Sequence, residues 1–310
     1  MKNLIKVLSL VAIIMVSSLL IFATNNKEPE YQSKPITDTT NTSEYYQIRA
    51  LKIPTNLEFA GERVPIEKAD IKERIDRELL VNTYWQSNGL LLFKRAHKYF
   101  PIIEPILEKN GIPNDFKYLA LIESGLQNVT SPAGAKGFWQ IMKATARENG
   151  LEVNPNVDER YHLEKSTQVA CNYLKDSKEL FGTWTMAAAA YNAGKSGVKR
   201  KIEAQQVTDY YDLLLAEETK RYVPRMVAIK EILTNPRKYG FIFENEDLYN
   251  LEATKTIKVD TAITNIATFS KDLGINYKKL KEHNPWLREN KLNNKSRKLY
   301  HIKVPVNVKN

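Results

Sequence analysis

A short apolar stretch near the middle of the chain ends in a single carboxylate. In the run 116–122 only Lys117 is clearly polar, so the pattern predicts a helix that is buried nearly all round. Glu123 comes seven residues after Phe116, which aligns its carboxylate with an apolar stripe of this helix. Gly125 then predicts the end of the helix. A carboxylate in such surroundings is unfavourable unless it is paired or protonated, so this stretch constrains what can pack around it.

Two interpretations of Glu123 follow from the sequence. Desolvation raises the pKa of a carboxyl group, and a raised pKa is what a general acid needs near neutral pH. Alternatively, Glu123 is a helix-end residue that is capped, ion-paired or turned to solvent, because structural ion pairs produce similar patterns. The helix alone does not separate the two interpretations.

Motifs after Glu123 favour the catalytic interpretation. Ser124 follows at once. The others are the turn-forming run Ser131–Ala135, the segment Gly137–Gln140, which we expect to open a helix, and the segments Tyr191–Gly194 and Glu218–Val223. Taken in this order, the motifs resemble the goose-lysozyme-like lytic transglycosylases of the membrane-bound lytic murein transglycosylase D type, in which a lysin-motif (LysM) domain follows the catalytic domain. The resemblance spans the chain from Tyr84 to the C-terminus.

The resemblance implies an enzyme that cleaves the β-1,4 bond between N-acetylmuramic acid (MurNAc) and N-acetylglucosamine (GlcNAc) in peptidoglycan. It implies that the MurNAc acetamido group attacks its own C1 while Glu123 protonates the leaving oxygen. Glu123 would then act as a base on the O6 hydroxyl, which closes a 1,6-anhydro ring. The implied substrate-binding residues are Ser124, Ser131, Gln140, Tyr191, Asn192 and Tyr222. The alternative for both tyrosines is a core position with a satisfied hydroxyl group.

The resemblance implies neither a metal nor a cofactor. The sequence agrees, since no group of Cys and His residues has the spacing of metal ligands. Cys171 is the single cysteine, so an internal disulfide is excluded, and its apolar neighbours predict a buried thiol.

Two other functions stay open at this point. The first is a hydrolytic muramidase on the same scaffold, which usually needs a second carboxylate to activate water. Asp158 and Glu159 are the nearest candidates in the motif region, but we interpret them as helix-start charges on a surface loop. The second is a non-catalytic cell-wall-binding protein, against which the intact motifs around Glu123 argue.

The C-terminal part of the chain carries most of the excess positive charge. The formal net charge is +10, and residues 251–310 hold thirteen basic and five acidic residues. A basic surface favours polyanions. With no nucleic-acid motif in the sequence, we expect peptidoglycan glycan strands with acidic peptides as the partner and no nucleic acid; the alternative is a merely solvated basic face. The pattern of the same segment is strand, helix, helix, strand, with Asn284-Pro285 after the second helix, and it resembles a LysM domain.

The N-terminus predicts export. Lys2 and Lys6 precede an apolar run that reaches Ala23, as in a secretory signal, and the run is also near the lower limit for a membrane anchor. We therefore expect a periplasmic or cell-envelope protein, with membrane attachment through the N-terminus if the signal is not cleaved.

The expected fold is mainly α, with a lysozyme-like all-α catalytic domain and a small α+β (βααβ) LysM-like domain. The expected divisions are a signal peptide or anchor (1–23), a tether with a short extended segment (24–66), the catalytic domain (67–240) and the LysM-like domain (251–306). Asn88-Gly89 is expected to interrupt the helical pattern between Lys68 and Phe100, and Asp260 or Thr261 to cap the first helix of the LysM-like domain.

Overall fold

The computed structural model describes residues 48–306. The expected signal or anchor (1–23) and residues 24–47 of the expected tether lie outside the described residues. Within the described part, no helix is both long and apolar enough to cross a lipid bilayer.

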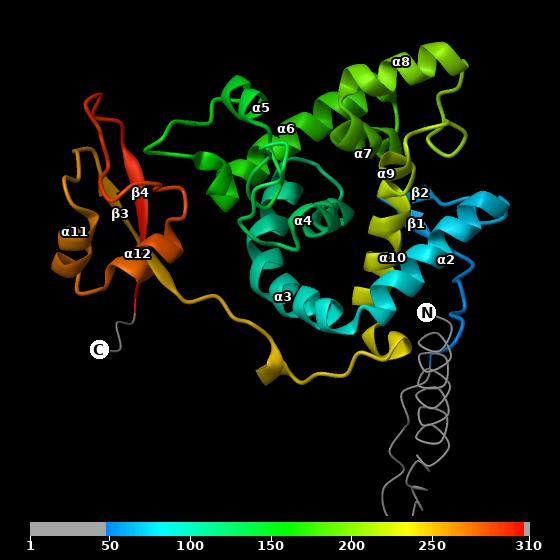
Figure 1. Ribbon diagram of the computed structural model, residues 1–310, viewed down its shortest axis with the longest axis horizontal. Helices are drawn as coiled ribbons and strands as arrows, with labels where there is room; N and C mark the ends of the chain where they lie inside the picture. Colours follow the sequence, from blue (N-terminus) through cyan, green and yellow to red (C-terminus); the bar gives the residue numbers. More distant parts are fainter. Residues whose placement is uncertain (1–47, 307–310) are drawn as a thin grey trace, which may run out of the picture. The chain divides into compact units, whose positions relative to one another are not determined.

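Helices dominate the part of the chain before residue 240, as expected for a mainly α protein (Figure 1). The α-helices are α2 (Ala69–Tyr84), α3 (Gln86–Lys109), α4 (Lys117–Ser124), α5 (Lys143–Glu148), α6 (Leu163–Phe181), α7 (Trp184–Ala193), α8 (Lys195–Gln205), α9 (Glu217–Lys220) and α10 (Tyr222–Thr234). Short 3-10 helices are η1 (Asn114–Phe116), η2 (Glu159–Tyr161), η3 (Pro236–Tyr239) and η4 (Asn245–Asp247). A small antiparallel hairpin of β1 (Glu58–Phe59) and β2 (Glu62–Arg63) precedes α2.

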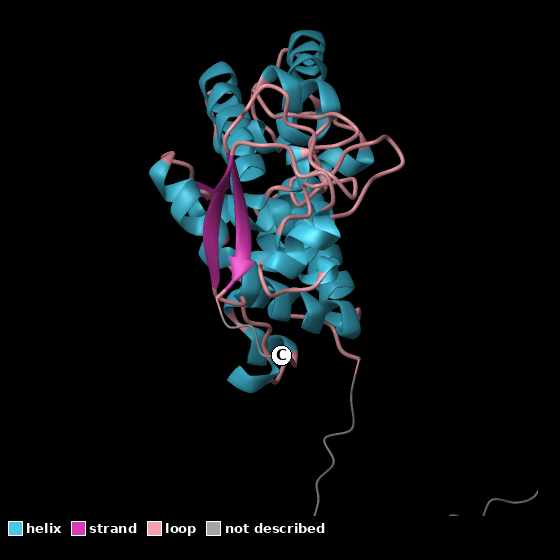
Figure 2. Ribbon diagram, turned by 90° about the vertical axis from the view of Figure 1, so that its left-hand side faces the viewer, coloured by secondary structure: helices cyan, strands magenta, loops and turns pink. Residues whose placement is uncertain are grey.

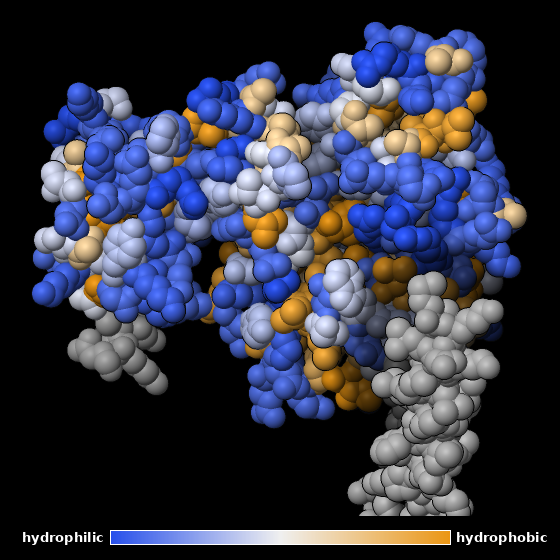
Figure 3. Space-filling view, in the orientation of Figure 1, coloured by the Kyte–Doolittle hydropathy of each residue, from blue (hydrophilic) through white to orange (hydrophobic). Residues whose placement is uncertain are grey.

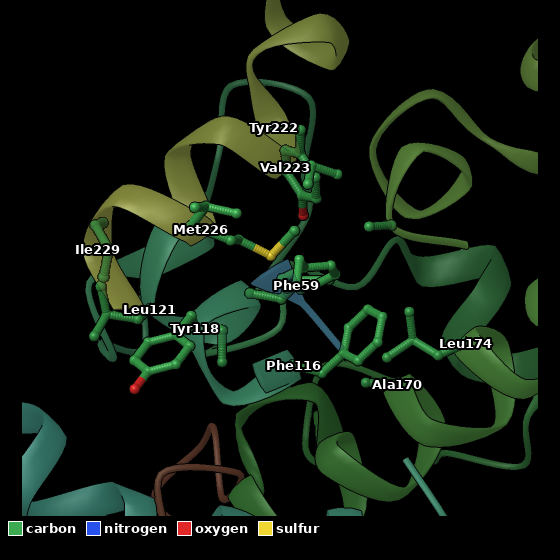
Figure 4. Packing of buried hydrophobic residues seen from close by; sticks show 14 of the residues in the cluster. Phe59, Phe116, Tyr118, Leu121, Ala170, Leu174, Tyr222, Val223, Met226 and Ile229 are labelled. Carbon is green, nitrogen blue, oxygen red and sulfur yellow. The ribbon is translucent and has the colours of Figure 1, made fainter. Parts of the chain in front are cut away.

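The helix that ends near Glu123 lies between α3 and α10 (Figure 1). Phe116 is fully buried and Leu121 is 2% exposed, which confirms that α4 is buried nearly all round. Figure 4 shows both side chains in one cluster with Tyr222 and Met226 of α10. The helix ends at Gly125, whose φ of +60° is the left-handed conformation that glycine adopts readily.

The break between the first two long helices differs from expectation. The chain leaves the helical conformation at Trp85, and Gly89 lies inside α3. A Cβ atom on Gly89 would lie 2.6 Å from the Phe241 ring, so this glycine permits a close approach of the aromatic ring. The expectation of a break at Asn88-Gly89 was wrong, because the glycine serves a tertiary contact.

The segment Gly137–Gln140 does not open a helix, contrary to expectation. The chain forms a tight loop in which Lys136 pairs with Ile141, and the helix begins only at Lys143. Gly137 has a φ of +79°, and a Cβ atom there would lie 2.1 Å from the carbonyl oxygen of Arg160. The close approach of a distant backbone segment therefore requires glycine and fixes the loop.

The C-terminal part is an α+β module with the expected order. Strand β3 (Thr254–Val259) pairs antiparallel with β4 (Tyr300–Pro305), and α11 (Ile266–Asp272) and α12 (Tyr277–His283) lie between them in sequence (Figure 2). Asn276 caps α12 as the asparagine pattern suggests, with its side chain accepting from Lys279 N at 2.9 Å. The cap of α11 is Asn265 and not Asp260 or Thr261, so the expected cap was wrong and the helix begins later in the chain.

The core of this module includes residues of the catalytic region. Val157 and Tyr161 belong to the same buried cluster as Trp286, Leu287 and Ile302. The outer surface of the module is predominantly hydrophilic in the view of Figure 3. The apolar side chains of the module are therefore used for its own core and for contact with the segment around Val157.

Candidate active site

Glu123 lies in the last turn of α4, half-buried, with its carboxylate bound by a tyrosine of another helix. The Tyr222 hydroxyl at the start of α10 donates a hydrogen bond to Glu123 Oε1. Burial raises the pKa of Glu123, and the charge of Glu218 raises this pKa further, whereas the Tyr222 hydrogen bond and Arg225 act in the opposite direction. The net effect is a raised pKa, as a general acid requires.

Tyr222 and Tyr191 occupy different positions around this carboxylate. Burial, followed by the charge of Glu123, holds the pKa of each tyrosine well above its usual value, so both hydroxyl groups stay protonated. Only Tyr222 is seen to bond to Glu123, because the Tyr191 hydroxyl donates to the carbonyl oxygen of Trp139 at 2.7 Å. Tyr191 thereby ties α7 to the loop after α4. Trp139 itself is fully buried, which places it in the core.

The predicted polar residues of the loop after α4 are engaged in holding that loop. Ser124 is nearly buried and its hydroxyl donates to the carbonyl oxygen of Phe138 at 2.8 Å. The Ser131 hydroxyl accepts from Ala135 N at 3.0 Å. Gln140 has a φ of +45°, outside the usual range for a side-chain-bearing residue, and its amide donates to Gly137 O at 2.8 Å. Each of the three side chains thus bonds to the backbone, and these contacts fix the geometry of the loop.

A pocket of about 280 Å³ brings Gln140 together with two other predicted residues. Its lining comes from the loop after α4, from α6 and from the end of α7, and includes Gln140, Met142, Tyr173, Tyr191, Asn192 and Gly194. Tyr191 faces this pocket and is also close enough to Glu123 for the carboxylate charge to affect its pKa. Glu123 itself does not line the pocket, and neither do Ser124, Ser131 and Tyr222.

Asn192 faces α9 as well as the pocket. Its Oδ1 accepts from the Thr219 hydroxyl at 2.8 Å, and its Nδ2 donates to Glu218 Oε1 at 3.4 Å. Glu218 is exposed and is the acidic residue whose charge acts on Glu123. Sequence reasoning singled out the motif that contains Glu218 but assigned this residue no role. Tyr173 and Met142 were missed as pocket residues, because an apolar or aromatic side chain in a helical pattern looks like core.

A second buried carboxylate, also missed, holds the start of α10. Glu78 on α2 is 1% exposed. Its Oε1 accepts from Arg77 Nη1 at 2.7 Å and from Arg221 Nε at 2.6 Å, and its Oε2 lies 3.6 Å from Arg225 Nε. The two arginines of α9–α10 flank Tyr222, so this ion-pair cluster fixes the helix turn that presents the Tyr222 hydroxyl. The available signal was the same as for Glu123, a carboxylate within an apolar stripe.

Asp158 and Glu159 are buried, with exposures of 4% and 2%, so their assignment to a surface loop was wrong. Asp158 does cap η2, as expected of a helix-start residue. Its carboxylate pairs with Arg160 at 2.8 Å, and Glu159 pairs with Lys165. Burial of these charges is tolerated because each has a cationic partner. Neither carboxylate is part of the pocket lining.

Within residues 48–306, no group of three or more His, Cys, Asp or Glu side chains could hold a metal ion. Cys171 is fully buried, and burial raises the pKa of its thiol to about 12. The thiol is therefore protonated and shielded at neutral pH, as a core residue would be.

Two family models match the chain. Residues 100–214 match the "Transglycosylase SLT domain", and residues 255–308 match the "Soluble lytic transglycosylase C-terminal LysM-like domain". The chain therefore contains a transglycosylase domain, which is an enzyme domain, followed by a LysM-like domain. The lysozyme-like fold and the LysM-like module expected from the sequence are confirmed. The match to the transglycosylase domain ends at residue 214, so it does not include Tyr222, the tyrosine that binds Glu123.

Curated relatives agree with this assignment. The "Membrane-bound lytic murein transglycosylase D" proteins of Escherichia coli strain K12 and of Escherichia coli O6:H1 are each 32% identical over 235 residues, which is 73% of this chain and 50% of each relative. The chain thus spans about half the length of the curated relatives it matches.

Solved structures give partial likenesses. The 70 kDa soluble lytic transglycosylase SLT70 of Escherichia coli is 24% identical with a TM-score of 0.40, covering 46% of this chain and 25% of that protein. Lytic transglycosylase Slt of Pseudomonas aeruginosa is 18% identical with a TM-score of 0.39, covering 49% of this chain and 26% of that protein. The two domain assignments rest on the family models.

Proposed function

We propose that this chain cleaves the MurNAc–GlcNAc β-1,4 bond of peptidoglycan as a lytic transglycosylase and leaves 1,6-anhydro-MurNAc ends. The observation that carries the proposal is the half-buried Glu123, which has a raised pKa and a tyrosine donor on one oxygen. A raised pKa favours the protonated form, which a general acid needs in order to donate a proton to a leaving group.

In the first step, Glu123 protonates the glycosidic oxygen as the bond from C1 of MurNAc breaks. The acetamido oxygen of the same sugar attacks C1 and forms a cyclic oxazolinium ion. Because Tyr222 occupies Oε1 of Glu123, the transferable proton belongs on Oε2.

In the second step, the Glu123 carboxylate takes the proton of the O6 hydroxyl. O6 attacks C1, the bond between C1 and the acetamido oxygen breaks, and the anhydro ring closes. Glu123 ends protonated, as it began, and no water is consumed. The Tyr222 hydroxyl donates to the carboxylate between the two steps and stabilises its charge.

The pocket lined by Tyr191 is the proposed site for a sugar ring. Tyr191 and Tyr173 offer aromatic surface, and Gln140 and Asn192 offer amide groups for the hydroxyl and acetamido substituents. Ser124 and Ser131 then act by shaping the loop that carries Gln140. Peptidoglycan strands are the proposed substrate, and the periplasm or cell envelope is the proposed location, with the N-terminal run as signal or anchor.

A digest of purified peptidoglycan tests for catalysis directly. Wild-type protein should clear a cell-wall zymogram, and Glu123→Gln should lose about 10²-fold or more of the activity, since it can neither donate nor accept the proton. The matched control is Glu148→Gln, an exposed residue at the end of α5, which should retain full activity. Clearing by neither wild type nor control would favour the non-catalytic wall-binding alternative.

The remaining alternative is a hydrolytic muramidase. It needs a carboxylate that activates water, and Asp158 and Glu159 are both committed to buried ion pairs. Glu218 is the residue to test, because it is exposed and its charge acts on Glu123. Reducing ends that disappear in Glu218→Gln would favour hydrolysis.

A further inference from the structure

The C-terminal module contacts the catalytic domain through residues 152–164, which we call the docking segment. Val157 and Tyr161 are 0% and 5% exposed and lie in the apolar cluster of the module. The backbone pairs as well, since Asp158 N donates to Trp286 O at 2.9 Å. Apolar burial and backbone pairing together are typical of a fixed interface rather than of a domain on a tether.

Asn156 satisfies three backbone groups of the module. Its carbonyl oxygen accepts from Arg288 N at 2.9 Å. Its side chain accepts from Asn293 N at 2.8 Å and donates to Lys291 O at 2.7 Å. Asn156 is 7% exposed, so these bonds replace water at a buried position.

Ion pairs surround this contact. Glu152 Oε2 accepts from Lys298 Nζ at 2.7 Å and from the Tyr300 hydroxyl at 2.9 Å. Lys303 of β4 pairs with Glu164 at the start of α6. Burial opposes ionisation of Glu164, but hydrogen bonds with His162 and with Lys303 lower its pKa to about 2. Part of the positive charge of the module is therefore used against the catalytic domain and not for a polyanionic ligand.

The docking segment also contacts residues 127–142, which we call the cleft loop. The Tyr161 hydroxyl lies 3.0 Å from Thr130 Oγ1. Arg160 Nη1 donates to Gly134 O at 3.1 Å and to Ile141 O at 3.3 Å. The cleft loop carries Gln140 and Met142 of the sugar pocket and Trp139, whose carbonyl oxygen receives the Tyr191 hydroxyl.

Two side chains make the connection continuous. The ring of Tyr161 packs against Arg288 of the module, with the guanidinium 4.2 Å from the ring centre. The hydroxyl of the same tyrosine contacts Thr130 of the cleft loop. Asp158 donates its backbone N–H to the module, and its carboxylate binds Arg160 and lies 3.6 Å from Nζ of Lys136 in the cleft loop. Each residue therefore contacts one structure through one group and the other through another group.

We propose that the C-terminal module is a brace for the catalytic site, holding the cleft loop in position through Asp158, Arg160 and Tyr161. The proposal rests on the proposed function of the pocket and adds a role for the module in turnover itself. A module that only binds the wall would matter for insoluble peptidoglycan alone. A brace matters equally for a glycan too short to reach the module.

The test compares two charge reversals in the full-length protein. Lys298→Glu breaks the pair with Glu152, whereas Lys255→Glu makes the same change of charge on an exposed position of β3. The substrates are insoluble sacculi and an uncrosslinked peptidoglycan tetrasaccharide in solution. We expect Lys298→Glu to lower kcat on the tetrasaccharide several-fold and Lys255→Glu to leave it unchanged. The double variant Lys298→Glu with Glu152→Lys should recover kcat in part.

Two further measurements separate bracing from general instability. Amide hydrogen exchange should accelerate in residues 127–142 of Lys298→Glu, a readout that needs no activity. Tyr161→Phe, which loses the bond to Thr130 but keeps its ring against the module, should lower kcat with an unchanged Tm. The brace is overturned if Lys298→Glu matches Lys255→Glu on the tetrasaccharide, or if exchange of the cleft loop does not change. Wild-type turnover of the same tetrasaccharide reports on the proposed function separately.

Discussion

At the scale of single residues, the chemistry depends on opposing influences on one carboxyl group. Burial raises the pKa of Glu123 most strongly, and the Tyr222 hydrogen bond opposes it. A group that must act first as an acid and then as a base benefits from both influences, since neither form becomes too stable. Tyr222 is therefore more than a cleft wall, and its hydroxyl group should set the pH range of activity.

We expect Tyr222→Phe to fold and to shift the pH profile. Loss of the hydrogen bond removes an influence that lowers the pKa of Glu123, so the alkaline limb of the kcat profile should move to higher pH. The maximal rate should fall by about 10- to 100-fold, since a bond to a charged group is worth roughly 1.5–3 kcal/mol. The control is Tyr239→Phe, whose hydroxyl contacts Glu231. A limb that moves to lower pH would contradict this account.

The same carboxyl group should also lower the stability of the protein at neutral pH. Because the pKa of Glu123 is raised in the folded state, its contribution to stability is largest below the pKa of an unfolded glutamate. That contribution is lost as the pH rises through the folded-state value. Glu123→Gln, which stays neutral, should therefore have a higher Tm than wild type at pH 8 and a similar Tm at pH 4. Equal Tm differences at both pH values would count against a raised pKa.

At the scale of elements, the contact between α2 and α10 positions the active site. Glu78→Gln should lower the free energy of unfolding by about 2–3 kcal/mol, below the value for a fully buried pair because its arginine partners reach solvent. It should also lower kcat, since the turn around Tyr222 loses its anchor. Urea unfolding compares it with Glu67→Gln, whose solvent-exposed pair with Arg63 should contribute little to stability. Equal unfolding midpoints for the two variants would refute the anchoring role.

Local signals predicted some elements well. The buried helix before Glu123, its end at Gly125 and the cap at Asn276 depend on neighbours in sequence, and all three were found as expected. The helix expected at Gly137 failed because a carbonyl group from residue 160 sets that backbone. Asp158 was misplaced on the surface because its burial depends on Arg160 and on the distant C-terminal module. Long-range contacts of this kind leave no periodic pattern in the sequence.

The site was predictable to a similar extent. The motif resemblance brought Gln140, Tyr191 and Asn192 together, and the structure places all three on one pocket. It did not distinguish the tyrosine that binds Glu123 from the one that holds the loop, since that depends on where each hydroxyl points. Glu78 lies in an apolar stripe as Glu123 does, but the arginines at the start of α10 that pair with it are far along the chain, so its role could not be assigned. The influence of Glu218 on Glu123 likewise depends on the folded chain.

At the scale of the whole molecule, the chain joins a catalytic domain to a basic module. The excess charge of the C-terminal segment should contribute to binding of full-length protein to insoluble peptidoglycan. Binding at 0.5 M salt should therefore be weaker than at low salt, because the Debye length shrinks below about 10 Å. A co-sedimentation assay measures this effect. Binding that does not change with salt would assign the charge to the internal ion pairs alone.

The product of the reaction is the most direct test of the central claim. Muropeptides released by wild-type protein should be analysed by mass spectrometry before and after treatment with borohydride. The account predicts that the acetamido group and then O6 of MurNAc attack C1, with Glu123 transferring the protons. The new ends will then be 1,6-anhydro-MurNAc, which is one water lighter than a hydrolysed end and is not reduced by borohydride. A majority of reducing ends would contradict the account and show that water, and not O6, reaches C1.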